Sequence, residues 1–498
     1  MSKQRKYFLY FTVFVTGAVV LVIEILGTRI LAPFFGATIF VWTSLITITL
    51  GALALGYFVG GKAIDKKPEP RILFSTILAA AFFVFLIMKI DQWALIMSDS
   101  LGLKWGPLLS AAILFAVPLF LLGMAGPMVI RLTSDDISHS GSSAGKVFAV
   151  STIGSIIGGI LAGFILIPRF SLTEILNSSA IILAILTLVG LILFQFKNRQ
   201  MQRDVAVLVL IIIGFGLFLP KYQYTDKYSF NVLHQEATHY SDLKVLEVGF
   251  TRCLAMDGAL QSCILTTTNK PSFSFIGEIH RLVGERNPKN FLLMGVGAGN
   301  VLEDFPGETK ITAVELDPRT IEMGKQYFNL KDDQYEKLVI SDARYFLRQN
   351  QEDFDMIFYD MAVGNVFPSH LFSREAFETV KEDLSDDGLF LLHLQGGFGR
   401  EDKQVGAVVK TLKEVFPTVF LTATELEQYT TIIVHASSDL NYTFENTGSR
   451  LREVPINWQE EVILTDNQNP FELVSLDKLS IFLDEMKNFG GFRMLFTS

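Results

Sequence analysis

Long, uninterrupted apolar segments dominate the first part of the chain. Six of them reach the roughly 20 residues that a helix needs to cross a bilayer, and they cover residues 7–31, 41–61, 72–97, 107–130, 147–168 and 172–196. A seventh segment, 205–219, has only 15 residues, so it is either a marginal span or an interfacial helix. The first segment is too long for a removable signal peptide and lacks a small-residue cleavage site. The pattern predicts a multi-span α-helical membrane domain of six or seven helices over residues 1–220.

Lys and Arg residues are distributed unevenly at the ends of these segments. Twelve would lie on one side of the membrane and four on the other. Because cytoplasmic loops carry the excess of basic residues, we expect the N-terminus in the cytoplasm. Six spans would return the chain to the cytoplasm, whereas a seventh at 205–219 would place the rest of the chain outside.

Small residues recur at four-residue spacing in two of the apolar segments. The pairs are Gly56 with Gly60, Gly154 with Gly158, and Gly159 with Gly163. Such spacing allows helix backbones to approach closely in lipid, so we expect helix packing at these positions.

Glu24 lies deep in the first apolar segment, where an ionised group costs roughly 2.5–3.5 kcal/mol or more. Arg29 is five residues further on and does not share its helix face. Glu24 therefore either has a polar partner on another helix or belongs to a polar or transport path.

Beyond residue 220 the pattern changes to short apolar runs that alternate with amphipathic segments. The stretch 244–265 is rich in strand-forming residues and is interrupted by Asp257-Gly258, a strong hairpin signal. Candidate strands follow at 291–294, 311–314, 337–340, 356–359 and 389–394, and candidate helices begin near Pro318 and Phe372 and cover 404–415. This alternation predicts an α/β fold with a doubly wound, Rossmann-like parallel sheet. We assign a β-strand-rich module to residues 221–285 and the Rossmann-like domain to residues 286–498.

Composition narrows the class of protein. Half of the residues are hydrophobic and the mean hydropathy is +0.38, which excludes a purely cytosolic or disordered chain. Residues 221–498 carry 26 Lys and Arg against 42 Asp and Glu, so nucleic acid is not an expected partner. The seven histidines show no metal-ligand spacing, and we propose no metal.

Glycines and carboxylates follow the predicted strands where a doubly wound sheet binds its ligand. The glycines after the first strand are Gly295, Gly297 and Gly299. Glu315 ends the second strand, where a carboxylate can accept both hydroxyls of a ribose. Asp342 follows the third strand and Asp360 the fourth, and together these residues indicate a nucleoside-containing ligand. In the alternative interpretation, Asp342 and Asp360 only cap helices or turns.

The second half of the chain resembles the spermidine/spermine synthase family, aminopropyltransferases built on the AdoMet-dependent methyltransferase fold. The D-G-x-x-Q stretch of that family is matched by Asp257-Gly258-Ala259-Leu260-Gln261. The whole chain resembles the membrane-fused branch, on residues that include Glu24, Arg29, Ala32, Pro33, Gly36, Trp42, Leu122 to Met124, Pro127, Asp360 to Gly364, Pro368, His370, Leu371, Arg374, Glu375, Leu464 to Asn467 and Pro470. The match extends over nearly the full length.

The resemblance implies transfer of an aminopropyl group from decarboxylated AdoMet to a small-molecule amine. It assigns the ribose to Glu315, the adenine amino group to Asp342, and the aminopropyl end to Asp360, which is the catalytic candidate. Gln261 and the three loop glycines complete the cofactor-binding set. The lipid bilayer is the other expected partner, and assembly into a homo-oligomer is left open.

Several residues depart from the family pattern. Ala298, Val363 and Asn365 stand where family members place carboxylates, and Ser241 stands where a glutamine is expected. Because buried ammonium groups need carboxylate partners, the nucleoside site is better supported than a diamine site. The alternatives are an AdoMet-dependent methyltransferase acting on a membrane-associated acceptor, and a non-catalytic nucleoside-binding sensor or transporter.

Cys253 and Cys263 flank the predicted Asp257-Gly258 turn. A three-residue loop would place them opposite each other, whereas a two-residue loop would pair Cys253 with Ser262. Facing cysteines can form a disulfide, which persists outside the cytoplasm and rarely inside it. The family's AdoMet-derived substrate is made in the cytoplasm, and on that ground we expect the synthase-like domain there.

Overall fold

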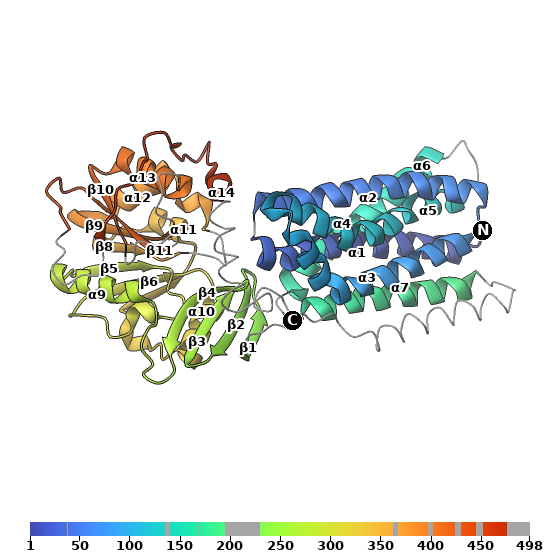
Figure 1. Cartoon of the computed structure of the whole chain (residues 1–498). Coiled ribbons are helices and arrows are strands. Elements are labelled where there is room, and N and C mark those ends of the chain that lie inside the picture. Colours follow the sequence, from blue (N-terminus) through green and yellow to red (C-terminus); the bar gives the residue numbers. More distant parts are fainter. Residues whose placement is uncertain are drawn as a thin grey trace. The chain divides into compact units, whose positions relative to one another are not determined.

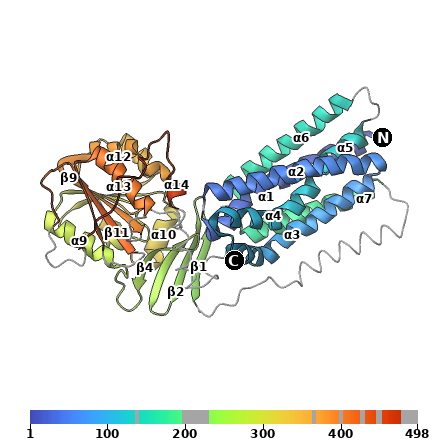
Figure 2. The same ribbon diagram turned by 45° about the horizontal axis from the view of Figure 1, so that its top comes forward.

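The computed structural model describes residues 1–36, 38–134, 140–167, 169–194, 230–361, 367–396, 402–423, 430–444 and 452–475. The chain forms two compact units, Met1–Thr225 and Asp226–Ser498 (Figures 1 and 2). Each unit is described by itself below. The domain boundaries at residues 220 and 285 stay predictions.

The first unit is a bundle of long apolar helices. They are α1 (Lys3–Phe35), α2 (Ile39–Lys66), α3 (Pro70–Asp99), α4 (Gly102–Gly123), α5 (Ala125–Thr133), α6 (Ser140–Leu161) with the π-helical turn η2 (Ala162–Leu166), and α7 (Leu172–Leu193). Within the described residues, six helical stretches are long and apolar enough to cross a membrane, with α4 and α5 forming one of them. The six predicted apolar segments thus correspond to six such helical stretches, while segment 205–219 lies outside the described residues.

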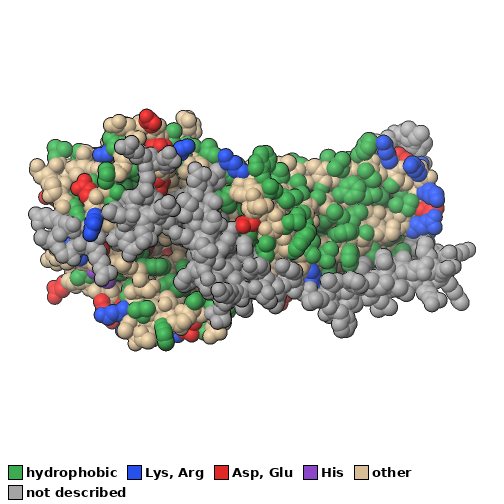
Figure 3. Space-filling model, viewed as in Figure 1, with side chains coloured by type: hydrophobic (Ala, Val, Ile, Leu, Met, Phe, Trp, Pro, Cys, Tyr) green, Lys and Arg blue, Asp and Glu red, His purple; other side chains and the backbone are tan. Residues whose placement is uncertain are grey.

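The first and last described helices of the bundle meet at one end. The Arg5 Nε donates a hydrogen bond to the Leu193 carbonyl oxygen at 3.0 Å, and its guanidinium lies over the Phe194 ring. The chain has therefore returned to its starting end of the bundle by residue 194. Figure 3 shows Lys and Arg side chains gathered at that end and hydrophobic side chains over much of the remaining visible surface of the unit.

Glycines on α6 allow close approach to α1. A β-carbon at Gly154 would overlap the backbone of Phe14, and one at Gly158 would overlap Ala18. The Ser155 hydroxyl also donates to the Gly17 carbonyl oxygen at 2.9 Å. The predicted close packing is confirmed for this pair of glycines.

The other predicted glycine contacts give a mixed result. Gly56 and Gly60 of α2 lie against Phe120 and Met124 of the α4–α5 segment, as expected. Gly159 faces the side chain of Leu21. At Gly163 no atom of the residues that the structure describes lies within 4 Å of an added β-carbon, so the expected close contact is not found among them.

Glu24 is partly exposed on α1 and makes no hydrogen bond or ion pair with any residue that the structure describes. The interhelical partner considered from the sequence is thus not found in the described part of the bundle. Its alternative, a polar or transport path, stays a prediction.

The second unit begins with a four-stranded antiparallel sheet in the order β1 (Asn231–Ala237), β2 (Asp242–Val248), β3 (Thr251–Met256), β4 (Ala259–Leu265). Asp257 and Gly258, both with positive φ, form a two-residue turn in which Met256 pairs with Ala259. The strand pairing then shifts register, so that Leu254 pairs with Ser262.

This shift corrects the two alternatives drawn from loop length. The turn is the two-residue type, yet Cys253 pairs with Cys263, because Gln261 is an extra residue in β4. The two cysteines form a disulfide.

The main sheet has eight strands in the order β12-β10-β11-β9-β8-β5-β6-β7. They are β5 (Asn290–Met294), β6 (Lys310–Glu315), β7 (Lys337–Ile340), β8 (Phe354–Tyr359), β9 (Leu384–Gly396), β10 (Thr418–Ala423), β11 (Thr430–Ser437) and β12 (Arg452–Glu453). The five predicted strands are β5 to β9, and they are parallel to one another. Strands β10 to β12 add an antiparallel edge that was not predicted. The α/β fold is confirmed.

Short helices cover the two faces of the main sheet. They are α9 (Ser274–Arg286), α10 (Pro318–Tyr327), α11 (Ala343–Gln349), α12 (Arg374–Glu382), α13 (Lys403–Val415) and α14 (Phe471–Val474), with 3-10 turns η3 (Asn300–Leu302), η4 (Asp332–Gln334) and η5 (Ser369–Leu371).

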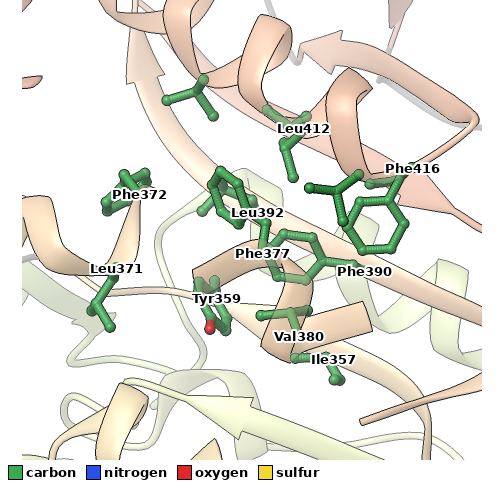
Figure 4. Packing of buried hydrophobic residues seen from close by; sticks show 14 of the residues in the cluster. Ile357, Tyr359, Leu371, Phe372, Phe377, Val380, Phe390, Leu392, Leu412 and Phe416 are labelled. Atoms are coloured by element: carbon green, nitrogen blue, oxygen red, sulfur yellow. The ribbon is translucent and has the colours of Figure 1, made fainter. Parts of the chain in front are cut away.

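Side chains of β9 alternate between two hydrophobic cores. Phe390 and Leu392 enter the core shown in Figure 4, where Phe377 of α12 and Leu412 of α13 pack against them. Leu391 enters the core on the opposite face, which contains residues of α9. The sheet is therefore held rigidly on both sides, which fixes the positions of its strand ends.

Candidate active site

The carboxyl ends of β5, β6, β7 and β8 lie next to one another at one edge of the sheet. Past the strand ends, the Asp360 N–H donates to the Met294 carbonyl oxygen and the Ser341 N–H donates to the Glu315 carbonyl oxygen, both at 2.9 Å. These bonds hold the loop after β8 beside the loop after β5, and the loop after β7 beside the end of β6. The predicted site residues therefore start from neighbouring positions.

The glycine-rich loop after β5 has the left-handed backbone that its sequence suggests. Gly295, Gly297 and Gly299 have φ values of 89°, 56° and 87°. A β-carbon at Gly295 would overlap the backbone oxygen of Asp360. Glycine is thus required there both for the backbone conformation and for the close approach of the two loops.

The small antiparallel sheet forms hydrogen bonds with this loop. The Ala298 N–H donates to the Ser262 Oγ at 3.1 Å, and the Asn300 side-chain amide donates to the Cys263 carbonyl oxygen at 2.8 Å. Ala298 is fully buried, and it shares an apolar cluster with Leu254 of β3. The disulfide-bonded strand β4 therefore contacts the glycine-rich loop directly.

Glu315, the predicted ribose ligand, is buried and binds backbone N–H groups. One carboxylate oxygen accepts from Val296 and Gly297 at 3.0 and 3.1 Å, and the other accepts from Leu316 and Asp317 at 2.8 and 3.1 Å. Burial raises the pKa of Glu315, and the four N–H donors act against that rise. Since a carboxylate has about four acceptor positions, a sugar would have to replace some of these donors.

Asp342 caps a helix, which is one of the two roles that the sequence suggested, while its contact with a nucleoside stays a prediction. One oxygen accepts from the Tyr345 N–H at 2.9 Å and caps α11, while the other lies 2.9 Å from the His370 Nε2. The hydrogen bond from His370 lowers the pKa of Asp342, more strongly than burial raises it. A capping carboxylate is thus held at the edge of the sheet and paired with an imidazole from the loop after β8.

Asp360 pairs with a residue that the sequence interpretation did not include. Its Oδ1 lies 2.6 Å from the Nδ1 of His393 on β9. The Asp360 side chain is 26% exposed, and its Oδ2 has no hydrogen-bond partner among the described residues. The carboxylate therefore presents one fixed oxygen to the protein and one oxygen that can receive a ligand.

A signal for His393 was present in the sequence. Residues 389–394 of strand β9 form an apolar run, and His393 is the polar residue that interrupts it. Because Tyr359 pairs with Leu392, the next residues on the two strands, Asp360 and His393, are also neighbours. Strand order was needed to see this, since 33 residues separate the two in sequence.

Asp466 and Asp317 both accept hydrogen bonds from groups of the protein itself. Asp466 accepts two hydrogen bonds from the Arg344 guanidinium at 2.7 and 2.5 Å, and one from the Ser373 hydroxyl at 2.6 Å. Asp317 caps α10 by accepting from the Arg319 N–H at 3.0 Å. The Asp466 cluster also holds the loop after β8, because Arg344 donates to the His370 carbonyl oxygen at 2.9 Å.

The remaining residues named from the sequence are Gln261, Ser241, Val363 and Asn365. Gln261 is the extra residue of β4, next to the Ser262 that contacts the glycine-rich loop. Ser241 is buried in the turn before β2, where its N–H donates to the Thr238 hydroxyl. Val363 and Asn365 lie outside the described residues.

Part of the chain is similar to known proteins. Residues 277–446 match the model of the spermine/spermidine synthase domain. A polyamine aminopropyltransferase of Bacillus mycoides is 27% identical over 212 residues, which cover 40% of this chain and 73% of the relative. A polyamine aminopropyltransferase of Oceanobacillus iheyensis is 22% identical over 369 residues, which cover 70% of each chain. The structure of a probable spermidine synthase from Corynebacterium glutamicum aligns at 17% identity with a TM-score of 0.39, over 49% of this chain and 97% of that one.

Proposed function

Because the chain carries a spermine/spermidine synthase domain in residues 277–446, we propose that it transfers an aminopropyl group from decarboxylated AdoMet to an amine. The observation that carries the proposal is Asp360. Within this domain it stands at the carboxyl end of β8, beside the glycine-rich loop, with one carboxylate oxygen available.

The reaction asks little of the protein beyond positioning and one proton transfer. The lone pair of the acceptor nitrogen attacks the aminopropyl carbon that is bonded to sulfur. The carbon–sulfur bond breaks, its electrons remain on sulfur, and methylthioadenosine leaves as a neutral thioether. As it attacks, the nitrogen gives one proton to the Asp360 carboxylate, so that the product amine forms without an extra charge; this is the role of a general base.

The nucleoside would be held by the loop glycines, Glu315, Asp342 and Gln261. Glu315 would accept the ribose hydroxyls in exchange for some of its backbone donors. Asp342 would accept the adenine amino group beside its contact with His370. This set suits a sugar-linked purine, because both carboxylates are already positioned by the backbone and by a helix cap.

The acceptor is proposed to be an amine with fewer positive charges than a diamine. Position 298 is an alanine, so it supplies no carboxylate for an ammonium group. Ala298 is buried, and its N–H donates to the Ser262 Oγ. Val363 and Asn365 are uncharged as well. Burial of an ammonium group without a carboxylate partner costs free energy. This cost favours a monoamine, which has one basic nitrogen, over a diamine.

The considerations that bear on the side of the membrane point in opposite directions. The excess of Lys and Arg supports a cytoplasmic N-terminus, and the cytoplasmic origin of the AdoMet-derived substrate supports a cytoplasmic synthase domain. The Cys253–Cys263 disulfide favours the opposite side. We keep the cytoplasmic assignment as the proposal, and the measurement that decides it is described in the Discussion.

The proposal is tested by incubating the purified full-length protein with decarboxylated AdoMet and a panel of monoamines and diamines. We expect release of methylthioadenosine, fastest with a monoamine. Asp360→Asn should lower the rate by about 10²- to 10⁴-fold, as for loss of a general base. Asp355→Asn is the matched control, because Asp355 lies on the same strand but near its amino end, where it binds the Lys289 and Asn290 N–H groups.

Absence of methylthioadenosine with every amine would refute the aminopropyl transfer. Release of S-adenosylhomocysteine from AdoMet would instead identify a methyltransferase. Binding of the nucleoside without any turnover, together with loss of uptake in Glu24→Gln, would indicate a sensor or transporter.

A further inference from the structure

His393 is a buried polar residue that the packing of the sheet does not require. It lies on β9 and is 8% exposed. Leu391 lies two residues earlier on the same face of β9, and Ile433 on β11 is the cross-strand partner of His393. Both belong to an apolar core. An apolar side chain would continue this pattern, so the imidazole calls for another explanation.

The imidazole ring is held on two sides. Its Nδ1 lies 2.6 Å from the Asp360 Oδ1, and its face stacks on the Phe275 ring of α9 with 4.1 Å between ring centres. A carboxylate oxygen can only accept, so the Nδ1 carries the hydrogen. The ring orientation is therefore set by a strand, a helix and a hydrogen bond together.

The other ring nitrogen makes the arrangement costly for folding. The His393 Nε2 is buried and has no hydrogen-bond partner among the described residues. A buried polar atom without a partner destabilises the folded state. Stability alone thus gives no reason for a histidine at this position, whereas its bond to Asp360 does.

We propose that His393 is the positioning residue for Asp360. Its Nδ1–H bond fixes the plane of the carboxylate and occupies Oδ1, so that Oδ2 is the oxygen that faces the acceptor nitrogen and receives its proton. Phe275 prevents the imidazole from rotating away. This inference rests on the proposed function, because it gives Asp360 the role of general base.

Two substitutions at this position separate the hydrogen bond from packing. His393→Leu removes the donor and keeps an apolar side chain, whereas His393→Asn keeps an N–H donor near the place of Nδ1. The control is His435→Leu on β11, which removes another buried imidazole that stacks on a phenylalanine, Phe420, in the same sheet. The full-length proteins are compared for kcat, for binding of methylthioadenosine by calorimetry, and for thermal unfolding.

We expect His393→Leu to lower kcat by about 10²-fold, the lower end of the range for general acid–base catalysis, with methylthioadenosine affinity within about twofold of the wild type. His393→Asn should recover about tenfold of that loss, and His435→Leu should keep the wild-type kcat. Wild-type kcat in His393→Leu would overturn the proposal. So would equal losses in the Leu and Asn variants accompanied by loss of nucleoside binding, since that result describes a packing role.

A second measurement does not depend on turnover. In protein labelled with ¹⁵N-histidine, the His393 Nδ1–H proton should resonate downfield of an ordinary imidazole N–H. The resonance should disappear in Asp360→Asn and persist in Asp355→Asn. If the wild type releases no methylthioadenosine but shows this resonance, the proposed function fails and the positioning pair stands. If the resonance is absent from the wild type, the positioning pair is refuted.

Discussion

Phe164 in the helical unit is 72% exposed, whereas Phe390 in the α/β unit is completely buried between β9 and its covering helices. Both are large aromatic side chains, yet their environments follow from different solvents. In lipid an exposed ring costs nothing, so the bundle is held by backbone contacts at glycines such as Gly154 and Gly158. In water the α/β unit must bury its aromatic rings, and it does so in two hydrophobic cores, one on each face of the main sheet.

The difference teaches where each unit tolerates change. The bundle should be sensitive to small residues becoming larger and insensitive to its outward hydrophobic side chains. The α/β unit should be sensitive to truncation of its buried aromatic side chains. The predictions that follow test this contrast, from the largest expected effect to the smallest.

Truncation of Phe390 should have the largest effect. Phe390→Ala would leave a cavity beside Phe377 and Phe416, and we expect the α/β unit to lose about 3–5 kcal/mol of unfolding free energy. Phe164→Ala in η2 is the matched change in the bundle and should alter stability by less than about 0.5 kcal/mol. Denaturant unfolding in detergent measures both, and equal losses would contradict the contrast.

Removal of the disulfide should have the next largest effect. The two cysteines are 10 residues apart, so Cys253→Ser with Cys263→Ser should cost about 2–3 kcal/mol in the chain-entropy model. Because β4 supports the glycine-rich loop, affinity for methylthioadenosine should fall as well. Thermal unfolding and calorimetry of oxidised, reduced and doubly substituted protein give the measurement. A reduced protein that unfolds and binds like the oxidised one would show that the bond is dispensable.

The same cysteines report the compartment. Trapping of free thiols in intact cells should find both of them reduced if the synthase domain is cytoplasmic, as proposed. A fully formed disulfide in cells would place the domain on the other side, and the segment 205–219 would then have to cross the membrane.

Enlargement of Gly154 should disturb only the bundle. In Gly154→Leu the new side chain would meet the backbone of Phe14, and overpacking of this kind costs about 1–3 kcal/mol. Gly163→Leu is the control, because an added β-carbon there meets no atom of the described helices within 4 Å. Loss of helical signal on heating, followed separately from unfolding of the α/β unit, distinguishes the two variants. Identical melting curves would show that the α1–α6 contact contributes little.

The smallest predicted effect concerns Asp383, which precedes β9. Burial raises the pKa of Asp383 to about 6, above the value of about 3.9 in an unfolded chain. Between these two pH values the folded state binds more protons, so the unfolding free energy should fall as pH rises from about 4 to 6 and stay lower above that range. Asp383→Asn should remove this dependence and stabilise the protein at pH 8 by about 1–2 kcal/mol. Unfolding at pH 5 and pH 8 tests it, with Asp355→Asn as the control.

The sequence predicted the elements well where a single period dominates. Six apolar segments became six helices, and five short apolar runs became the parallel strands β5 to β9, because length and periodicity alone decide these cases. The antiparallel strands β10 to β12 escaped notice, since no turn signal of comparable strength marks them.

Pairing between strands was harder to predict. The facing cysteines were considered only through loop length, and the extra residue at Gln261 changed the register within β4. No local signal in the sequence distinguishes such a bulge from regular pairing. For the same reason His393 was missed, because its contact with Asp360 depends on which strands are neighbours.

The candidate site shows a similar division. The positions of Glu315, Asp342 and Asp360 at strand ends follow from the sequence, since a carboxylate after each strand is visible. Their present hydrogen bonds do not, because the partners of Glu315 and Asp342 come from loops and that of Asp360 from the neighbouring strand β9, and tertiary packing brings them together.

The four backbone donors on Glu315 have a kinetic consequence. In the proposed nucleoside complex, a ribose on this carboxylate would compete with the Val296 and Gly297 N–H groups, which donate to the same oxygen. Return of these two hydrogen bonds would favour release of the product, so we expect the spent nucleoside to leave faster than from a carboxylate without such donors. The two main-chain N–H groups would thus weaken nucleoside binding and speed release of the product.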